Sequence, residues 1–141
     1  MTLNFLNKKI SYDSVDDKDV LLIINRIRQG IEYSLFISIA NKSPLSMQEW
    51  SNFLHISERT LQRYKKEKRT FDTLQSERIL QIVLLIELGI DVFGTEEKFN
   101  NWLETENLAL GKINPKELLD NAFGISLLKD ELNRIGHGVL A

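Results

Sequence analysis

The segment 74–93 constrains the fold of this chain most strongly, because it is apolar on more than one side. Its aliphatic side chains are Ile79, Leu80, Ile82, Val83, Leu84, Leu85, Ile86, Leu88 and Ile90. A helix that is hydrophobic most of the way round is buried centrally or lies in an oligomer interface. We therefore expect this segment to be the spine of the fold.

The rest of the chain also has a helical pattern. From Lys18 onward, apolar residues recur at helical spacing, and good N-cap residues separate the periodic segments. The β-branched and aromatic residues of 32–37 leave a strand open there, although we favour a helix. The sequence predicts an all-α fold, a compact domain of short helices around one long helix, with residues 1–17 as a loosely held arm.

Composition excludes several classes of function. The 141 residues contain no Cys and only two His, His55 and His137, which are far apart in the sequence. We therefore expect no catalytic residues, no cofactor and no metal site, and an enzyme is the least favoured function. The absence of Cys suits a reducing cytoplasm, where we expect the protein to act. No apolar run approaches the ~20 residues that span a bilayer, so we expect no membrane association.

The net charge of -2 conceals an uneven distribution. Residues 46–78 carry a net charge of +2, whereas residues 79–141 carry -5. Within 59–69, six residues are basic and only Glu67 is acidic. Such asymmetry predicts one face for polyanions and another face for a different partner.

Residues 46–68 have the pattern of a helix-turn-helix. Ser46 begins the first helix with a capping box to Glu49, and Ser57 is a good N-cap for the second. In this motif the second helix enters the major groove of DNA. The predicted DNA-binding residues are Ser57, Arg59, Thr60, Gln62, Arg63, Lys65, Lys66, Lys68 and Arg69. The alternative is a basic helix face that meets only solvent.

Residues 93–141 carry a series of short motifs in a fixed order. The motifs are Phe93-Gly94, Trp102-Leu103, Leu110-Gly111, Asn114-Pro115, Leu118-Leu119 and the closing Arg-Ile-Gly-His-Gly-Val-Leu-Ala of 134–141. This series closely resembles the C-terminal toxin-binding region of Xre/MbcA/ParS-type antitoxins. The Thr-Leu-Gln-Arg of 60–63 also resembles the Xre-like helix-turn-helix of that family. The chain departs from the family pattern at Glu106, where Pro is common, and at Lys112, where a second Gly is common.

The resemblance implies a type II antitoxin that binds a RES-domain toxin, an enzyme that consumes NAD. Members of this family neutralise the toxin by laying their C-terminal region against its active-site opening. On this basis the toxin-binding residues are Leu110, Gly111, Arg134, His137, Gly138, Val139, Leu140 and Ala141. The helix-turn-helix would lie in residues 18–93 and the toxin-binding region in 94–141. Operator binding would require a homodimer, for which 74–93 is a candidate interface.

Helical spacing also predicts which residues of the C-terminal region are core. We expect Trp102, Leu103, Leu118, Leu119 and Phe123 to be buried, and a helix to begin at 114–117, where Asn, Pro and Glu suit its first turn. Gly124 would separate this helix from a last one over 125–135.

Two other functions remain open. One is a stand-alone transcription regulator whose C-terminal region only dimerises. The other is an adaptor whose helix-turn-helix has lost DNA binding, since Glu58 and Glu67 would oppose phosphates.

Overall fold

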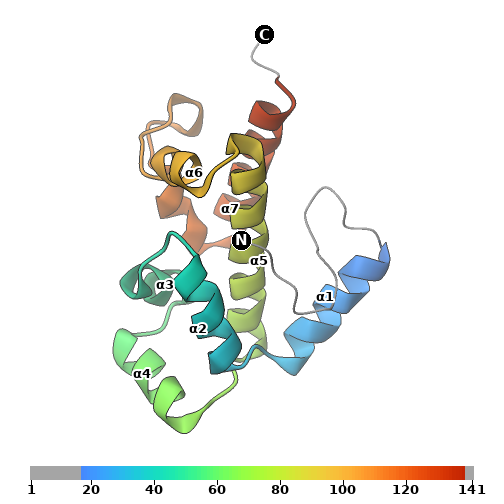
Figure 1. The fold of residues 1–141 in the computed structure, drawn as a ribbon, viewed down its shortest axis with the longest axis vertical. Coiled ribbons are helices and arrows are strands. Elements are labelled where there is room, and N and C mark those ends of the chain that lie inside the picture. Colours follow the sequence, from blue (N-terminus) through green and yellow to red (C-terminus); the bar gives the residue numbers. More distant parts are fainter. Residues whose placement is uncertain (1–16, 139–141) are drawn as a thin grey trace.

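The computed structural model describes residues 17–138, and every regular element in that range is a helix (Figure 1). The α-helices are α1 (Asp17–Gln29), α2 (Tyr33–Lys42), α3 (Met47–Leu54), α4 (Glu58–Glu67), α5 (Thr73–Phe93), α6 (Glu96–Leu103) and α7 (Ala122–Gly136). Two 3-10 helices, η2 (Leu108–Leu110) and η3 (Pro115–Asp120), lie between α6 and α7. The predicted all-α class is confirmed: residues 33–37 lie in helix α2, and only Glu32 before it forms an isolated β-bridge, with Thr70.

Helix α5 is the centre of the fold, as its pattern predicts. Residues 82–89 are all buried, and α1, α6 and α7 pack against this helix. Gly89 allows α6 to approach, because a Cβ at this position would lie 2.1 Å from the ring of Phe99. Since the chain itself buries residues 82–89, they are not available to a second copy.

Helices α2, α3 and α4 are joined through a cluster of aromatic rings near the start of α5. The ring of Phe36 lies 5.4 Å from that of Trp50, edge-on, and 5.0 Å from that of Phe71. Tyr64 of α4 lies 5.3 Å from Phe71 between ring centroids. Such pairs add about 0.5–1.5 kcal/mol to the effect of burial. The cluster therefore fixes α4 relative to the two preceding helices.

The second half of α5 is covered by α6 and α7, and η3 packs against both of these helices. The rings of Phe93, Phe99 and Trp102 lie within 6.3 Å of one another between centroids. Helix α7 runs in the same direction as α5 and packs against it (Figure 1). The two helices are close at their C-terminal ends, where a Cβ at Gly136 would lie 3.1 Å from the side chain of Val92. The predicted core residues that are buried or half-buried here are Trp102, Leu103, Leu118 and Leu119.

The passage from η3 to α7 differs from the sequence prediction. Residues 114–117 begin a 3-10 helix rather than an α-helix. The Oδ1 of Asn121 accepts a hydrogen bond from the backbone N–H of Gly124 at 2.7 Å, so α7 begins at Ala122, earlier than predicted. In this register Phe123 is 90% exposed, and the prediction that it belongs to the core is wrong. Gly124 therefore lies in the first turn of α7. A Cβ at this position would come within 2.2 Å of a backbone carbonyl oxygen of η3, so a larger residue does not fit there.

Candidate functional site

The first helix of the helix-turn-helix begins as the sequence predicts. The Oγ of Ser46 accepts from the N–H of Glu49 at 3.1 Å, and the N–H of Ser46 donates to Oε1 of Glu49 at 2.9 Å. This capping box satisfies two donors that the first turn would otherwise leave free.

The turn between α3 and α4 is held by local hydrogen bonds. His55 ends α3 in the left-handed region, with φ 58°, and the Oγ of Ser51 donates to the carbonyl of Ile56 at 2.5 Å. The Oγ of Ser57 then caps α4 by accepting from the N–H of Thr60 at 3.0 Å, and it also donates to the Thr60 hydroxyl. Two of the predicted DNA-binding residues, Ser57 and Thr60, therefore also build the start of the helix.

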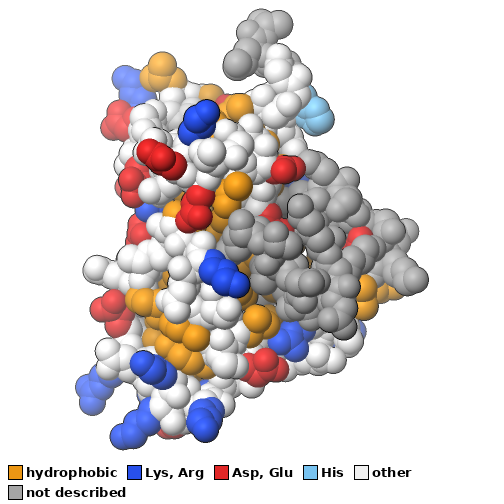
Figure 2. Space-filling view, viewed as in Figure 1, with side chains coloured by type: hydrophobic (Ala, Val, Ile, Leu, Met, Phe, Trp, Pro, Cys, Tyr) orange, Lys and Arg blue, Asp and Glu red, His pale blue; other side chains and the backbone are white. Residues whose placement is uncertain are grey.

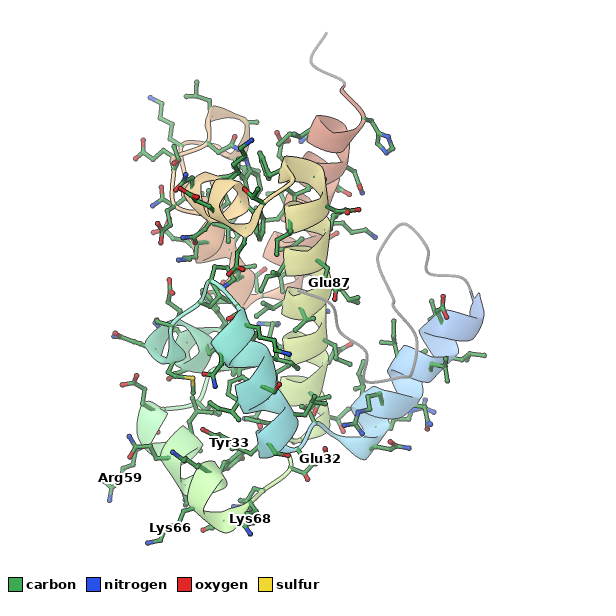
Figure 3. All side chains as sticks on the ribbon, viewed as in Figure 1. Glu32, Tyr33, Arg59, Lys66, Lys68 and Glu87 are labelled. Carbon is green, nitrogen blue, oxygen red and sulfur yellow. The ribbon has the colours of Figure 1, made fainter. Side chains whose placement is uncertain are left out.

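Helix α4 presents most of the predicted DNA-binding residues on one surface. Leu61 is buried and Tyr64 is half-buried, which fixes the inner face of the helix. The outer face forms an open groove of about 530 Å³, and its lining residues are Arg59, Thr60, Gln62, Arg63 and Lys66. Figure 3 shows Arg59 and Lys66 pointing away from the body of the molecule. Basic side chains aimed outward from the second helix are what contact with DNA requires.

The remaining basic residues lie at the other side and the end of α4. Lys65 and Lys68 line a second hollow of about 340 Å³ together with Tyr33 of α2. Burial raises the pKa of Tyr33. Arg69 lies over the ring of Tyr64 at 5.3 Å and pairs with Glu67 at 3.5 Å. These three basic residues are therefore separated from the outer groove of α4.

Five of the predicted toxin-binding residues lie in the loop after α6 or at the end of α7, and both segments are at the opposite end of α5 from helix α4 (Figure 1). Leu110 is buried, so it anchors the loop 105–113, and Gly111 closes η2 in the left-handed region with φ 81°. The most exposed large apolar residue of this loop is Leu108, at 81% exposure, which the sequence motifs did not select.

The end of α7 carries the other predicted toxin-binding residues. Arg134 is exposed and pairs with Glu131, and His137 and Gly138 are exposed just beyond the helix. His137 also borders a small groove of about 190 Å³ between the ends of α5 and α7. The three remaining predictions, Val139, Leu140 and Ala141, lie outside the described residues.

Charge separates the two ends of the molecule. In the face that Figure 2 shows, Lys and Arg gather around α4, whereas most Asp and Glu side chains lie over the half that contains α6. The uneven charge of the sequence is thus also uneven in space. A polyanion and a differently charged partner would find separate surfaces.

An ion-pair network joins the helix-turn-helix to the C-terminal half. The Nζ of Lys116 in η3 lies 3.0 Å from a carboxylate oxygen of Glu49 in α3 and 2.8 Å from one of Glu104. Burial alone would lower the pKa of Lys116, but the hydrogen bonds to Glu104 and Glu49 outweigh it and raise that pKa. The pKa of Glu49 is lowered. Burial alone would raise this pKa, but the backbone N–H of Ser46 and the ammonium group of Lys116 stabilise the charged carboxylate and outweigh burial.

His55 makes the second link between the two halves. Its Nε2 lies 2.7 Å from the backbone carbonyl oxygen of Asp120, at the end of η3. Residues 49, 55, 116 and 120 therefore tie the helix-turn-helix to η3. No sequence motif marks these contacts, because they join residues that are 65 positions apart or more.

Within residues 17–138, no three His, Cys, Asp or Glu side chains converge as a metal site would require. Helix α5 and the other helices of this range are too short or too polar to cross a membrane.

The fold and its two ends define a class: a helix-turn-helix protein with an attached partner-binding region. Residues 23–84 match the Antitoxin Xre-like helix-turn-helix domain, and residues 88–138 match the Antitoxin Xre/MbcA/ParS C-terminal toxin-binding domain. Together these matches span most of the chain. The protein therefore belongs to the Xre/MbcA/ParS family of type II antitoxins.

Known relatives agree with this assignment. A protein named Antitoxin Xre from Yersinia enterocolitica is 26% identical over 121 residues, which are 85% of this chain and 82% of the relative. A second Antitoxin Xre, from Photorhabdus laumondii, is 24% identical over 139 residues, which are 98% of this chain and 92% of the relative. The fold is similar to a chain in the crystal structure of the M. tuberculosis MbcT-MbcA toxin-antitoxin complex. The TM-score is 0.61 at 16% identity, over 77% of this chain and 96% of that chain.

Proposed function

We propose that this antitoxin neutralises a RES-domain toxin that degrades NAD, and that helix α4 binds the operator of its own genes. In this proposal the C-terminal region covers the toxin's active site. The antitoxin acts by binding, as a homodimer, and catalyses no reaction.

The observation that carries the proposal is the separation of the two faces along α5. This helix has 21 residues, so at 1.5 Å per residue its ends lie about 30 Å apart. The basic face of α4 is near one end and the end of α7 is near the other (Figure 1). A toxin and an operator can therefore be bound at the same time without competing for one surface.

Charge supports each half of the proposal. Residues 79–141 carry a net charge of -5, which complements a toxin cleft that binds an anionic nucleotide. Arg59, Arg63 and Lys66 on the outer face of α4 complement phosphate and base acceptors of DNA.

The proposal is tested by ending the chain at Gly138 and co-expressing it with its cognate toxin. We expect the truncated antitoxin to lose protection, so that cellular NAD and growth fall to the level of toxin alone. The same truncated chain keeps its operator gel shift, because α4 is untouched, and this result is the control for folding. A truncated chain that still protects cells would contradict the proposed role of the C-terminal residues.

A further inference from the structure

A groove of about 400 Å³ lies where the two halves of the molecule meet, and none of its lining residues is a predicted DNA-binding or toxin-binding residue. The end of α3, the start of α5 and the start of α7 form its walls. The residues that matter here are Phe53, Leu54, Leu74, Arg78 and Ala122. These four apolar residues come from three helices, α3, α5 and α7, that are far apart in the sequence, so the groove exists only in the folded chain.

Large apolar side chains stand in solvent beside this groove. Leu74 on its wall is 76% exposed, and Phe123, the residue after Ala122, is 90% exposed. Leu127 follows Phe123 by one turn of α7 and is 44% exposed, so these two share a face. Phe123 does not itself line the groove of its own chain, although the preceding residue, Ala122, does. We call Leu74, Phe123, Leu127 and the groove the junction patch. Large apolar side chains that are exposed next to a groove are typical of an interaction surface.

We infer that the junction patch is the two-fold interface of an antitoxin homodimer, in which Phe123 of each copy occupies the groove of the other. A two-fold interface brings the same patch of both copies together, so a projecting group and its receptor must both lie on it. The junction patch has both. A cavity of about 150 Å³ holds a benzene ring, so the groove has room for a phenyl side chain.

The charges around the groove favour a second copy over a partner of one charge sign. Asp72 and Glu77 lie on its wall together with Arg78, so the wall carries charges of both signs. When such a mixed patch meets itself across a two-fold axis, acidic groups of one copy can face basic groups of the other. A uniformly charged partner would instead meet like charges.

This inference deepens the proposed function, because paired operator half-sites require two α4 helices in a fixed relation. His55 borders the groove and precedes the α4 N-cap Ser57 by only two residues. An interface at this place would therefore contact the turn that precedes each α4 helix and would fix the two α4 helices relative to each other.

The first test measures mass by light scattering on the purified full chain, without DNA or toxin. We expect a mass near twice 16.4 kDa. Phe123→Ser removes a buried ring from each half of the interface, so we expect the dimer to weaken by about 100-fold or more. The matched control is Leu108→Ser, which changes a residue of similar exposure (81%) at the far end of α5 and leaves the dimer intact. Circular dichroism confirms that both variants are folded.

The second test uses the absence of Cys in the chain. We expect a mixture of separately purified Leu74→Cys and Phe123→Cys variants, carrying different tags, to form a mixed disulfide on mild oxidation. A mixture of Leu108→Cys and Phe123→Cys forms none beyond background.

A monomeric wild type, a Phe123→Ser variant that stays dimeric, or a Phe123→Ser variant that loses toxin binding while its mass is unchanged would each overturn the inference. Since the mass is measured without toxin or DNA, its outcome is separate from the NAD and gel-shift outcomes that test the proposed function.

Discussion

The two ends of α5 are built in different ways. At the helix-turn-helix end, the outward side chains belong to one short helix, and that helix is capped by residues within it or next to it. At the C-terminal end, the surface combines the loop 105–113 with the end of α7. A surface on one helix follows from local sequence, whereas a surface of two segments depends on how α5 packs both of them.

The two ends also share one core and one joint. Helix α5 runs through both halves, and Lys116 and His55 tie α3 to η3. Separate binding faces therefore do not imply separate folding units. Variants in each half therefore test whether the two halves, which have different proposed binding roles, also differ in stability. They follow from the largest expected change in stability or binding to the smallest.

Trp50→Ala should cause the largest loss of stability. Trp50 is fully buried, and its ring packs on Phe36 in the aromatic cluster of the helix-turn-helix. Truncation of such a residue costs about 3–5 kcal/mol. Because α5 is common to both halves, we expect a single unfolding transition at a lower temperature, measured by calorimetry.

The matched variant is Phe99→Ala, which removes a fully buried ring from the other half. It should lower stability by a similar amount, again in one transition. Two separate unfolding transitions in either variant would show that the two halves are independent folding units.

Replacing Arg59 and Arg63 together by Gln should weaken operator binding by roughly 100-fold, because a side chain that reads DNA contributes about 1–3 kcal/mol. For each phosphate that the variant no longer neutralises, the slope of log affinity against log salt falls by about 0.9. Both side chains are on the open groove of α4, so toxin binding should not change. A matched control is Lys98→Gln, an exposed charge at the other end of the molecule. Equal gel shifts for all three proteins would contradict a role of α4 in DNA binding.

The sequence predicts those features that depend on neighbours along the chain. The caps at Ser46 and Ser57 and the central burial of 82–89 are confirmed, because a cap or a helix face involves residues within a few positions of one another. The exposure of Phe123 could not be predicted in this way. It depends on where α7 begins, which the cap of Asn121 determines, and on the packing of α7 against the rest of the fold, which leaves Phe123 in solvent.

The candidate site shows the same limit. The outward residues of α4 could be predicted from their spacing, but the burial of Leu110 could not, because packing of the loop 105–113 determines it. Likewise, no local pattern brings Lys116 to Glu49, since the two are in different halves of the chain. Contacts that join distant segments follow only from the complete fold.

Lys116→Met should cost about 1–2 kcal/mol of stability near neutral pH, because it leaves the half-buried carboxylate of Glu49 without its ammonium partner. The side chain of Lys116 is only 11% exposed, so solvent replaces this partner poorly. Chemical denaturation of the wild type and the variant measures the difference. Lys112→Met, at an exposed position of the preceding loop, should change stability by less than about 0.5 kcal/mol and is the control.

The same pair of proteins tests the pH dependence of this joint. The pKa of Glu49 is lowered from its usual 4.5, so its contribution is present above that value and is lost as pH falls through the folded-state pKa. The pKa of Lys116 is raised from 10.5, so its contribution is present below that value and is lost as pH rises through the folded-state pKa. The stability difference between wild type and Lys116→Met should therefore be largest between these limits and should shrink as the pH falls through the lowered pKa of Glu49. A difference that is constant with pH would mean that packing, rather than charge, makes the joint.

Arg134→Ala should change stability least, by less than about 1 kcal/mol, because the Arg134 side chain is 57% exposed, although that of its partner Glu131 is only 12% exposed. Its predicted role is in toxin binding, so the informative measurement is the affinity for the toxin, for which we expect a loss of about tenfold or more. Glu131→Ala separates the two roles, since it removes the same ion pair and leaves the guanidinium group in place. If Arg134 contacts the toxin, only Arg134→Ala weakens the complex. If Arg134 acts only through its ion pair with Glu131, both variants weaken the complex equally. Arg134 would then not belong to the surface that contacts the toxin, even though it lies within the toxin-binding domain.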